Sequence, residues 1–286
     1  MMRWFWVLVS VFLVPSAVLA EMPSEASIKA VADAWLAKKP APSFGAVMSI
    51  SGAARVQERY TAFIAKELGS VVGYKAALTN PAVQKRFNYD KPLRGTLYEK
   101  MILQSGARVP SAYGARPVFE ADMIAVVGDA AKLMAAKTPL DALGALKEIR
   151  SFIEMPDILF DLQVKLDGPT LLGVNALARL GILGNSIPLP ATADAVAKLA
   201  AMKVEVLDQT GAVLGGGKGS DVLENPLNAV LWIAESLRGE GKAVKNGDLL
   251  SLGSFSALLP PKPGMTVTVR YTGLTPEPVE VKVTFE

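Results

Sequence analysis

The sequence contains neither cysteine nor histidine. Without cysteine, the chain has no disulfide, no thiolate metal site and no cysteine nucleophile. Without histidine, it has no Ser-His-Asp triad, no imidazole general base and almost none of the ligand sets that bind catalytic zinc. Any catalysis by this chain must therefore use carboxylates, lysine, tyrosine, hydroxyl groups, the backbone or a hard metal ion.

A strong excess of charge of either sign is also missing. The chain has 30 Lys and Arg residues against 27 Asp and Glu residues, which gives a formal net charge of +3. No stretch of basic residues is dense enough to follow a phosphate backbone. We therefore expect no nucleic-acid partner.

Apolar residues are plentiful. Of the 286 residues, 51% are hydrophobic, which is enough for a full core and excludes a disordered protein. The length suits one large domain or two small ones.

The N-terminus has a distinct pattern. Arg3 precedes an uncharged, mostly apolar run from Trp4 to Leu13, and small residues lead up to Ala20. This layout is typical of a secretory signal peptide. The alternative is a membrane anchor, but the run is shorter than the roughly 20 residues that span a bilayer. The sequence predicts a signal peptide over residues 1–20, an exported protein that is periplasmic or secreted, and no membrane association after cleavage.

The remaining chain combines helical and extended patterns. Apolar periodicity and capping residues predict helices over residues 24–38, 53–68 and 226–237, with a short helical piece over 81–87. Strands are predicted over 71–78, 95–103, 118–127, 203–208, 212–214, 249–252, 265–271 and 279–285, and residues 145–159 are mixed. Helices come first and strands dominate the rest, which indicates an α+β fold. We expect an N-terminal helical part over residues 21–70 and a second domain over residues 71–286.

Two carboxylates stand close together in the strand predicted over 118–127. Glu120 and Asp122 are two residues apart, so they point to the same face of that strand. Either they bind a cation or the strand exposes this face to water, since each arrangement satisfies the charges. Glu154 offers a third carboxylate in an apolar stretch. Three carboxylates form a hard-oxygen site that favours Mg²⁺, Mn²⁺ or Ca²⁺.

A single lysine interrupts the apolar strand predicted over 71–78. Lys75 could simply extend its ammonium to the surface, which is the commoner case. Alternatively it binds a substrate carboxylate or acts as a base with a depressed pKa.

Several segments, taken in order, resemble the 2-keto-4-pentenoate hydratase branch of the fumarylacetoacetate hydrolase superfamily. The resemblance covers about residues 51–285. It rests on GYKAALT at 73–79, AVQKRF at 82–87, RPVFEADMIA at 116–125, IEMPD at 153–157, NPLNAVLWIA at 225–234, GDLL at 247–250 and GS at 253–254. The chain departs from the family pattern at Leu252, where a threonine is common, and at Asn80-Pro81, where a Ser-Lys pair is common.

The resemblance implies a mixed β-roll preceded by N-terminal helices, and subunits that associate as homo-oligomers. It places Glu120, Asp122 and Glu154 as ligands of Mg²⁺ or Mn²⁺ and Lys75 as the active-site lysine. Lys75 and Ser254 would then be catalytic, and Lys75, Gly253 and Ser254 would bind the substrate.

The resemblance also implies an activity. The chain is expected to be a metal-dependent hydratase, a hydro-lyase that acts on a small unsaturated 2-oxo acid through a metal-stabilised enolate. Two alternatives stay open: a 2-oxo acid decarboxylase of the same family, and an exported binding protein that keeps the fold without catalysis. The hydrolase branch of the superfamily ranks lower, because its Glu-His pair needs a histidine that this chain lacks.

Overall fold

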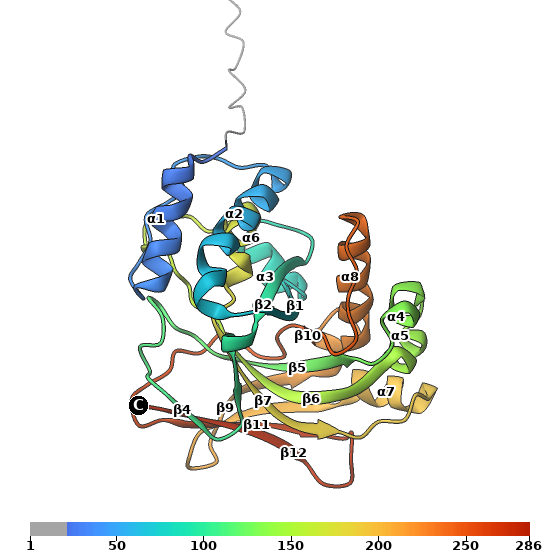
Figure 1. The fold of residues 1–286 in the computed structure, drawn as a ribbon. Coiled ribbons are helices and arrows are strands. Elements are labelled where there is room, and N and C mark those ends of the chain that lie inside the picture. The colour runs from blue at the N-terminus through green and yellow to red at the C-terminus, as the bar shows by residue number, and fades with distance from the viewer. Residues whose placement is uncertain (1–21) are drawn as a thin grey trace, which may run out of the picture.

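The computed structural model describes residues 22–286, which form two β-sheets and several layers of helices (Figure 1). Within these residues the larger sheet has seven strands, in the order β2 (Leu93–Tyr98), β1 (Val71–Ala77), β10 (Leu249–Ser251), β5 (Glu120–Val127), β6 (Leu146–Met155), β7 (Leu180–Ile187) and β3 (Ile102–Gln104). The smaller sheet has five, in the order β4 (Ala107–Val109), β12 (Val279–Phe285), β11 (Thr266–Thr272), β8 (Lys203–Leu207) and β9 (Val213–Lys218).

Both sheets are mixed. The pairs β1–β10, β3–β7 and β4–β12 are parallel, and the other pairs are antiparallel. Strand β11 alternates buried and half-buried positions, because one face packs inward and the other is partly exposed to water. Strand β5 is buried at every position after Glu120, because it is central in its sheet and covered on both faces.

The helices begin at residues that cap their free N–H groups. The α-helices are α1 (Glu25–Leu36), α2 (Ile50–Leu68), α3 (Pro81–Arg86), α4 (Ala130–Ala135), α5 (Pro139–Ala145), α6 (Gly168–Gly173), α7 (Ala193–Ala201) and α8 (Pro226–Gly239). Short 3₁₀ turns are η1 (Glu99–Met101), η2 (Asn175–Leu177) and η3 (Gly219–Asp221). Ser24, Ser49 and Asn225 each accept a backbone N–H at the start of a long helix, which satisfies donors that the helix itself cannot pair.

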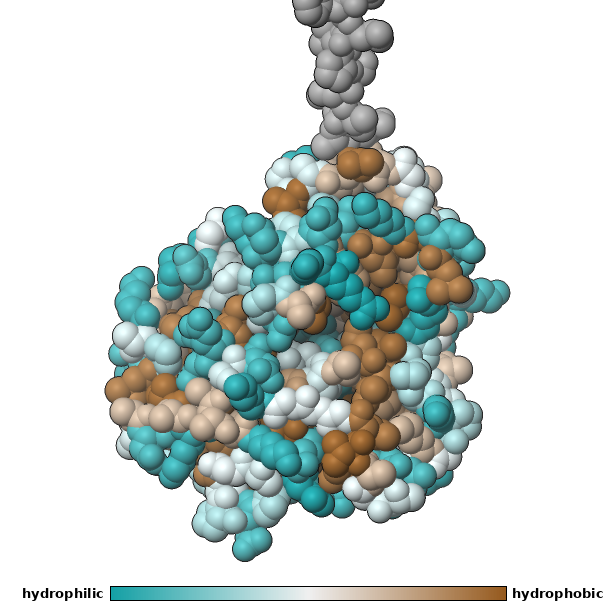
Figure 2. All heavy atoms as spheres, turned by 180° about the vertical axis from the view of Figure 1, so that it is seen from behind, coloured by the Kyte–Doolittle hydropathy of each residue, from teal (hydrophilic) through white to brown (hydrophobic). Residues whose placement is uncertain are grey.

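The apolar side chains form distinct cores. The largest lies between the two sheets and beneath α4, α5, α7 and α8. A second core, containing Trp35, Tyr60 and Phe160, lies beneath α1 and α2. These helices cover α6 and the first strands at one end of the molecule (Figure 1). The face turned away in Figure 1 mixes polar side chains with a strip of apolar ones (Figure 2).

The α+β class predicted from sequence is confirmed, as are the three long helices and most of the strands. The differences lie in elements with weak local patterns. Strand β6 replaces the mixed stretch at 145–159, and the strand predicted over 95–103 is divided by η1. Strands β4 and β7 and helices α4, α5, α6 and α7 were not predicted. Two glycines inside β7 weaken its pattern, and its pairing with β6 compensates.

Two further predictions concern the chain's ends and boundaries. The signal peptide predicted over residues 1–20 lies outside the described residues. Within residues 22–286 the structure has no helix whose length and apolarity would let it cross a bilayer. The division at residue 70 stays a prediction.

Candidate active site

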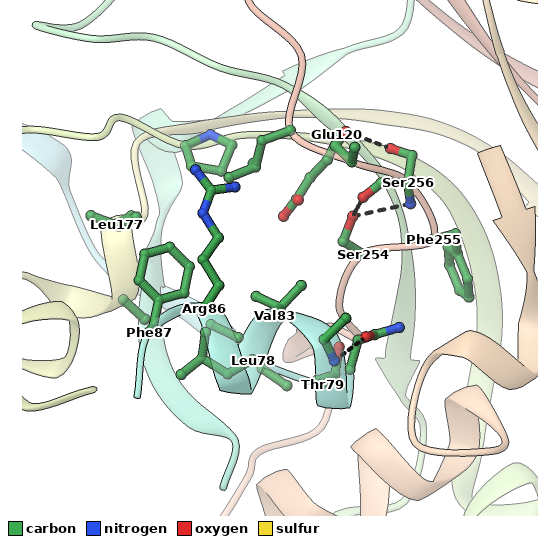
Figure 3. A pocket seen from close by; sticks show the side chains of 18 of the residues that line it. Leu78, Thr79, Val83, Arg86, Phe87, Glu120, Leu177, Ser254, Phe255 and Ser256 are labelled. Carbon is green, nitrogen blue, oxygen red and sulfur yellow. Dashed lines mark hydrogen bonds between the residues drawn. The ribbon is translucent and has the colours of Figure 1, made fainter. Parts of the chain in front are cut away.

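A cavity of about 460 Å³ opens between strand β1, helix α3, the turn η2 and the loop at 254–258. Most of its wall is apolar, from side chains such as Leu78, Val83, Phe87, Leu177 and Phe255. The charged side chains that line it are Lys75, Arg86, Glu120 and Asp221. Glu120 points into the cavity beside Ser254, and Arg86 lies across from it (Figure 3). The volume is within the range of small-molecule sites.

Two carboxylates stand opposite each other beside this cavity, and Glu120 is the one that lines it. Glu120 on β5 stands directly opposite Glu154 on β6 in the antiparallel register. Side chains at such positions are neighbours, and like charges there repel. Burial raises the pKa of Glu120 well above its usual range, and the Glu154 carboxylate raises it further. Each of these carboxylates therefore favours a cation nearby.

The third carboxylate, Asp122, is fully buried and tied to the backbone. Its Oδ1 accepts the N–H groups of Met123 at 2.6 Å, Gly253 at 2.9 Å and Leu252 at 3.1 Å. The Ser251 hydroxyl donates to its Oδ2. Burial is the main reason that the pKa of Asp122 rises to about 7; the Glu154 carboxylate adds to it and these hydrogen bonds oppose it. Asp122 therefore fixes the turn after β10 while remaining part of the charged cluster.

Lys75 is buried, with 2% of its surface exposed, so its ammonium does not extend to the molecular surface. Its ammonium forms an ion pair with Glu154 Oε1 and donates to the Ala176 carbonyl at 3.0 Å. Gly95 pairs with Lys75 across β1 and β2, and a Cβ there would lie 2.8 Å from the Lys75 Cγ. The absence of a side chain at Gly95 thus makes the room that Lys75 occupies.

The turn η2 places the Ala176 carbonyl next to the Lys75 ammonium, and the backbone of this turn has an unusual conformation. Asn175, Ala176 and Leu177 have φ values of 59°, 51° and 62°, in the left-handed region that costs non-glycine residues about 1–2 kcal/mol each. The Asn175 side chain offsets this cost. It accepts the Thr96 N–H at 2.7 Å and donates to the Thr96 carbonyl at 2.8 Å, as a neighbouring strand would.

Ser254 and Gly253 follow the Asp122-bound turn. Ser254 lines the cavity, and its hydroxyl donates to the Ser256 carbonyl at 2.6 Å. Gly253 has a φ of 110°, and a Cβ there would lie 2.1 Å from the Thr79 hydroxyl, so only glycine fits. The Gly253 N–H points to Asp122 rather than into the cavity. The catalytic and substrate-binding roles of these residues stay predictions.

The donor set suits a hard divalent cation. Glu120, Asp122 and Glu154 supply only oxygen atoms, and Lys75 alone neutralises one of their three charges. The buried Glu154 Oε1 forms an ion pair with the Lys75 ammonium. Over residues 22–286, no three acidic side chains are already arranged as a metal-binding group. The three carboxylates thus have the ligand chemistry that a hard divalent cation requires. In this structure Lys75 is the cation that pairs with Glu154.

Sequence reasoning did not single out Ser251, Thr79, Asn175 or Arg86. Ser251 lies opposite Lys75 in the parallel β1–β10 register, which no local pattern reveals. Thr79 and Arg86 belong to motifs that carried the resemblance, yet nothing in their spacing indicated that both would line the cavity.

Comparisons with known proteins agree with this fold. The chain is 32% identical over 205 residues to a 2-keto-4-pentenoate hydratase of Burkholderia vietnamiensis, covering 71% of this chain and 75% of that protein. It is 27% identical to a 4-oxalocrotonate decarboxylase of Pseudomonas sp., over 71% of this chain and 75% of that one. The structure of 4-oxalocrotonate decarboxylase from Pseudomonas putida G7, in complex with magnesium and adipate, matches with a TM-score of 0.78 at 23% identity, covering 92% and 97% of the two chains. No protein-family model matches the chain.

The structural neighbours show that the chain has the mixed β-roll fold of fumarylacetoacetate hydrolase-like proteins. The chain belongs to the 2-keto-4-pentenoate hydratase family. The family resemblance, the mixed β-roll and the hydratase-like enzyme class expected from the sequence are therefore confirmed.

The comparisons also correct one prediction. The relatives are cytoplasmic catabolic enzymes, so the expectation of an exported, periplasmic or secreted protein is wrong. That expectation depended only on the apolar run at 4–13 and the small residues before Ala20, which is a pattern of composition.

Proposed function

We propose that the protein is a metal-dependent hydratase that adds water to a small unsaturated 2-oxo acid in the cavity beside Glu120. The observation that carries the proposal is the cluster of the half-buried Glu120 with the buried Asp122, Glu154 and Lys75, beside a cavity of about 460 Å³. A buried cluster with perturbed pKa values in a cleft is typical of a catalytic centre. The names of the relatives supply the substrate class.

Glu120, Asp122 and Glu154 would hold Mg²⁺ or Mn²⁺, as the magnesium complex of a related structure supports. When bound, the ion supplies Lewis-acid stabilisation of the negative charge that develops on the substrate's 2-oxo oxygen. Lys75 would pair with the substrate carboxylate or move a proton at the reacting carbon, because its ammonium is buried beside the cavity. Ser254, at the rim near Glu120, would orient the attacking water.

A spectroscopic assay tests this proposal. Conjugated 2-oxo acids absorb in the ultraviolet, and hydration removes the conjugation. With Mg²⁺ or Mn²⁺ we expect the absorbance of 2-keto-4-pentenoate to fall, and the rate to vanish in EDTA. No loss of absorbance from any unsaturated 2-oxo acid, in a protein that binds the metal, would refute the activity.

Decarboxylation of a 2-oxo acid is the second candidate, because two relatives are 4-oxalocrotonate decarboxylases. The same assay separates the two when released carbon dioxide is measured in parallel. Association into homo-oligomers also remains a proposal, and light scattering of the purified protein tests it.

A further inference from the structure

The cavity contains one cation that the proposed chemistry does not use. Of the lining side chains, Lys75 and Arg86 are basic, and Glu120 and Asp221 are acidic. Lys75 is already paired with Glu154. The Asp221 carboxylate accepts the Lys218 N–H at 2.8 Å. No carboxylate within residues 22–286 forms an ion pair with Arg86.

The position of Arg86 is set by helix α3. Asn80 caps this helix, with its side chain accepting the Ala82 N–H at 2.8 Å, and Arg86 is the last helical residue. Its guanidinium lies 5.5 Å from the centroid of the Phe87 ring, a cation–π arrangement. In Figure 3 the Arg86 side chain rises along one wall of the cavity while Glu120 points in from the opposite wall. Apolar side chains, including Val83 and Leu177, line the space near them.

This arrangement has an anion site at each end. Lys75 and a cation bound by the carboxylates would bind the 2-oxo acid group of the substrate. Arg86 is then available to bind an anionic group at the opposite end of the cavity. A guanidinium matches a carboxylate with two parallel hydrogen bonds, and both partners stay charged at neutral pH. An apolar stretch between two cationic ends matches a short carbon chain with an acid group at each end.

We propose that Arg86 binds a second, distal carboxylate, so that the cavity selects dicarboxylic over monocarboxylic 2-oxo acids. The inference rests on the proposed function for the orientation of the substrate. It assigns Arg86 as a specificity-determining residue and leaves the reaction at the 2-oxo end unchanged.

Binding of two saturated acids of equal length tests the proposal without turnover. 2-Oxoadipate has a carboxylate at each end, whereas 2-oxohexanoate has one, and neither carries the double bond that hydration requires. We expect wild-type protein with Mg²⁺ to bind 2-oxoadipate about tenfold more tightly by calorimetry, a modest factor because Arg86 is exposed to water. Arg86→Met should abolish the preference and leave 2-oxohexanoate affinity unchanged.

Lys85→Met is the matched control. Lys85 is exposed on the same helix and does not line this cavity, so its substitution removes the same charge from the same surface. We expect the control to keep the tenfold preference. A wild-type protein that binds both acids equally, or an Arg86→Met variant that keeps the preference, overturns the role of Arg86 alone. A wild-type protein that binds neither acid overturns the proposed function and this inference together.

Discussion

At the scale of single residues, the proposed metal site brings together more negative than positive charge. Glu120, Asp122 and Glu154 carry three negative charges when ionised, and Lys75 carries one positive charge. Removing carboxylates from water is costly unless each is paired or hydrogen-bonded. The raised pKa values of Glu120 and Asp122 express that cost, since burial is the first cause of both.

Glu120→Gln should make the metal-free protein more stable while it abolishes turnover. The substitution removes the charge that faces Glu154 but keeps the shape of the side chain. We expect the free energy of unfolding, measured by urea denaturation in EDTA at pH 8, to rise by about 1 kcal/mol. Glu148→Gln on the neighbouring strand β6, a residue ion-paired with Arg150, is the control and should change it by less than about 0.5 kcal/mol. A Glu120→Gln protein that is less stable than wild type would contradict the repulsion between the Glu120 and Glu154 carboxylates.

The stability of the metal-free protein should fall as pH rises. The pKa of Asp122 is about 7 in the folded protein, above its usual value of 3.8, so the folded state binds more protons between these values. The stabilisation that protonated Asp122 gives the folded state is complete below about pH 4 and is lost as the pH rises through 7. Metal ligands must be deprotonated, so stabilisation by Mg²⁺ should increase over the same window. Melting temperatures from pH 5 to 8.5, with EDTA or Mg²⁺, measure both trends. An unchanged melting temperature in EDTA would contradict the assignment.

At the scale of secondary-structure elements, the site depends on register. Strand β1 lies between β2 and β10, which brings Gly95 and Ser251 to either side of Lys75. The sequence indicated Lys75, Glu120, Asp122 and Glu154 because their local patterns are unusual in apolar strands. It could not reveal the donors to Asp122, because residues 251–253 reach Asp122 only through the antiparallel pairing of β10 with β5. It also missed the turn η2, whose left-handed residues have no characteristic local pattern.

Gly95→Ala tests the packing between these elements. A Cβ at this position would lie 2.7 Å from the Asn175 carbonyl oxygen and 2.8 Å from Lys75 Cγ, so the lysine or the turn must move. We expect a loss of about 1–3 kcal/mol in unfolding free energy and a fall in turnover of at least about tenfold. Gly144→Ala is the control, because Gly144 lies in α5 and no neighbouring atom comes within 4 Å of the position that its new methyl group would take. Equal changes in unfolding free energy and turnover in Gly95→Ala and Gly144→Ala would contradict this packing argument.

At the scale of the whole molecule, the N-terminal helices and the sheets share a core. Tyr60 of α2 and Phe160 belong to the same buried cluster as Leu171 of α6 and Ala176 of η2. The turn that supports Lys75 therefore packs against the helices that begin the described chain. The sequence predicted the order of helices and strands, but this shared core depends on long-range contacts that periodicity does not specify.

A fragment of residues 71–286 should not fold cooperatively. Without α1 and α2, the buried faces of Phe160, Leu171 and Val174 would be open to water, and their burial contributes about 25 cal/mol per Å² of apolar surface. We expect the fragment to lose the cooperative melting transition that full-length protein shows in near-ultraviolet circular dichroism. A fragment that melts like the full chain would establish residues 71–286 as an independent domain.

Exchange of substrate protons with solvent tests the central claim most directly, because it does not require the natural substrate. The claim is that this cavity, with a divalent cation and Lys75, labilises the proton beside the 2-oxo group of a bound acid. In D₂O we would follow the C3 protons of 2-oxopentanoate by proton nuclear magnetic resonance. The account predicts exchange that requires both protein and Mg²⁺ or Mn²⁺, is lost in EDTA and in Lys75→Met, and persists in Gly144→Ala. Exchange that continues in EDTA, or that Lys75→Met leaves intact, would contradict it.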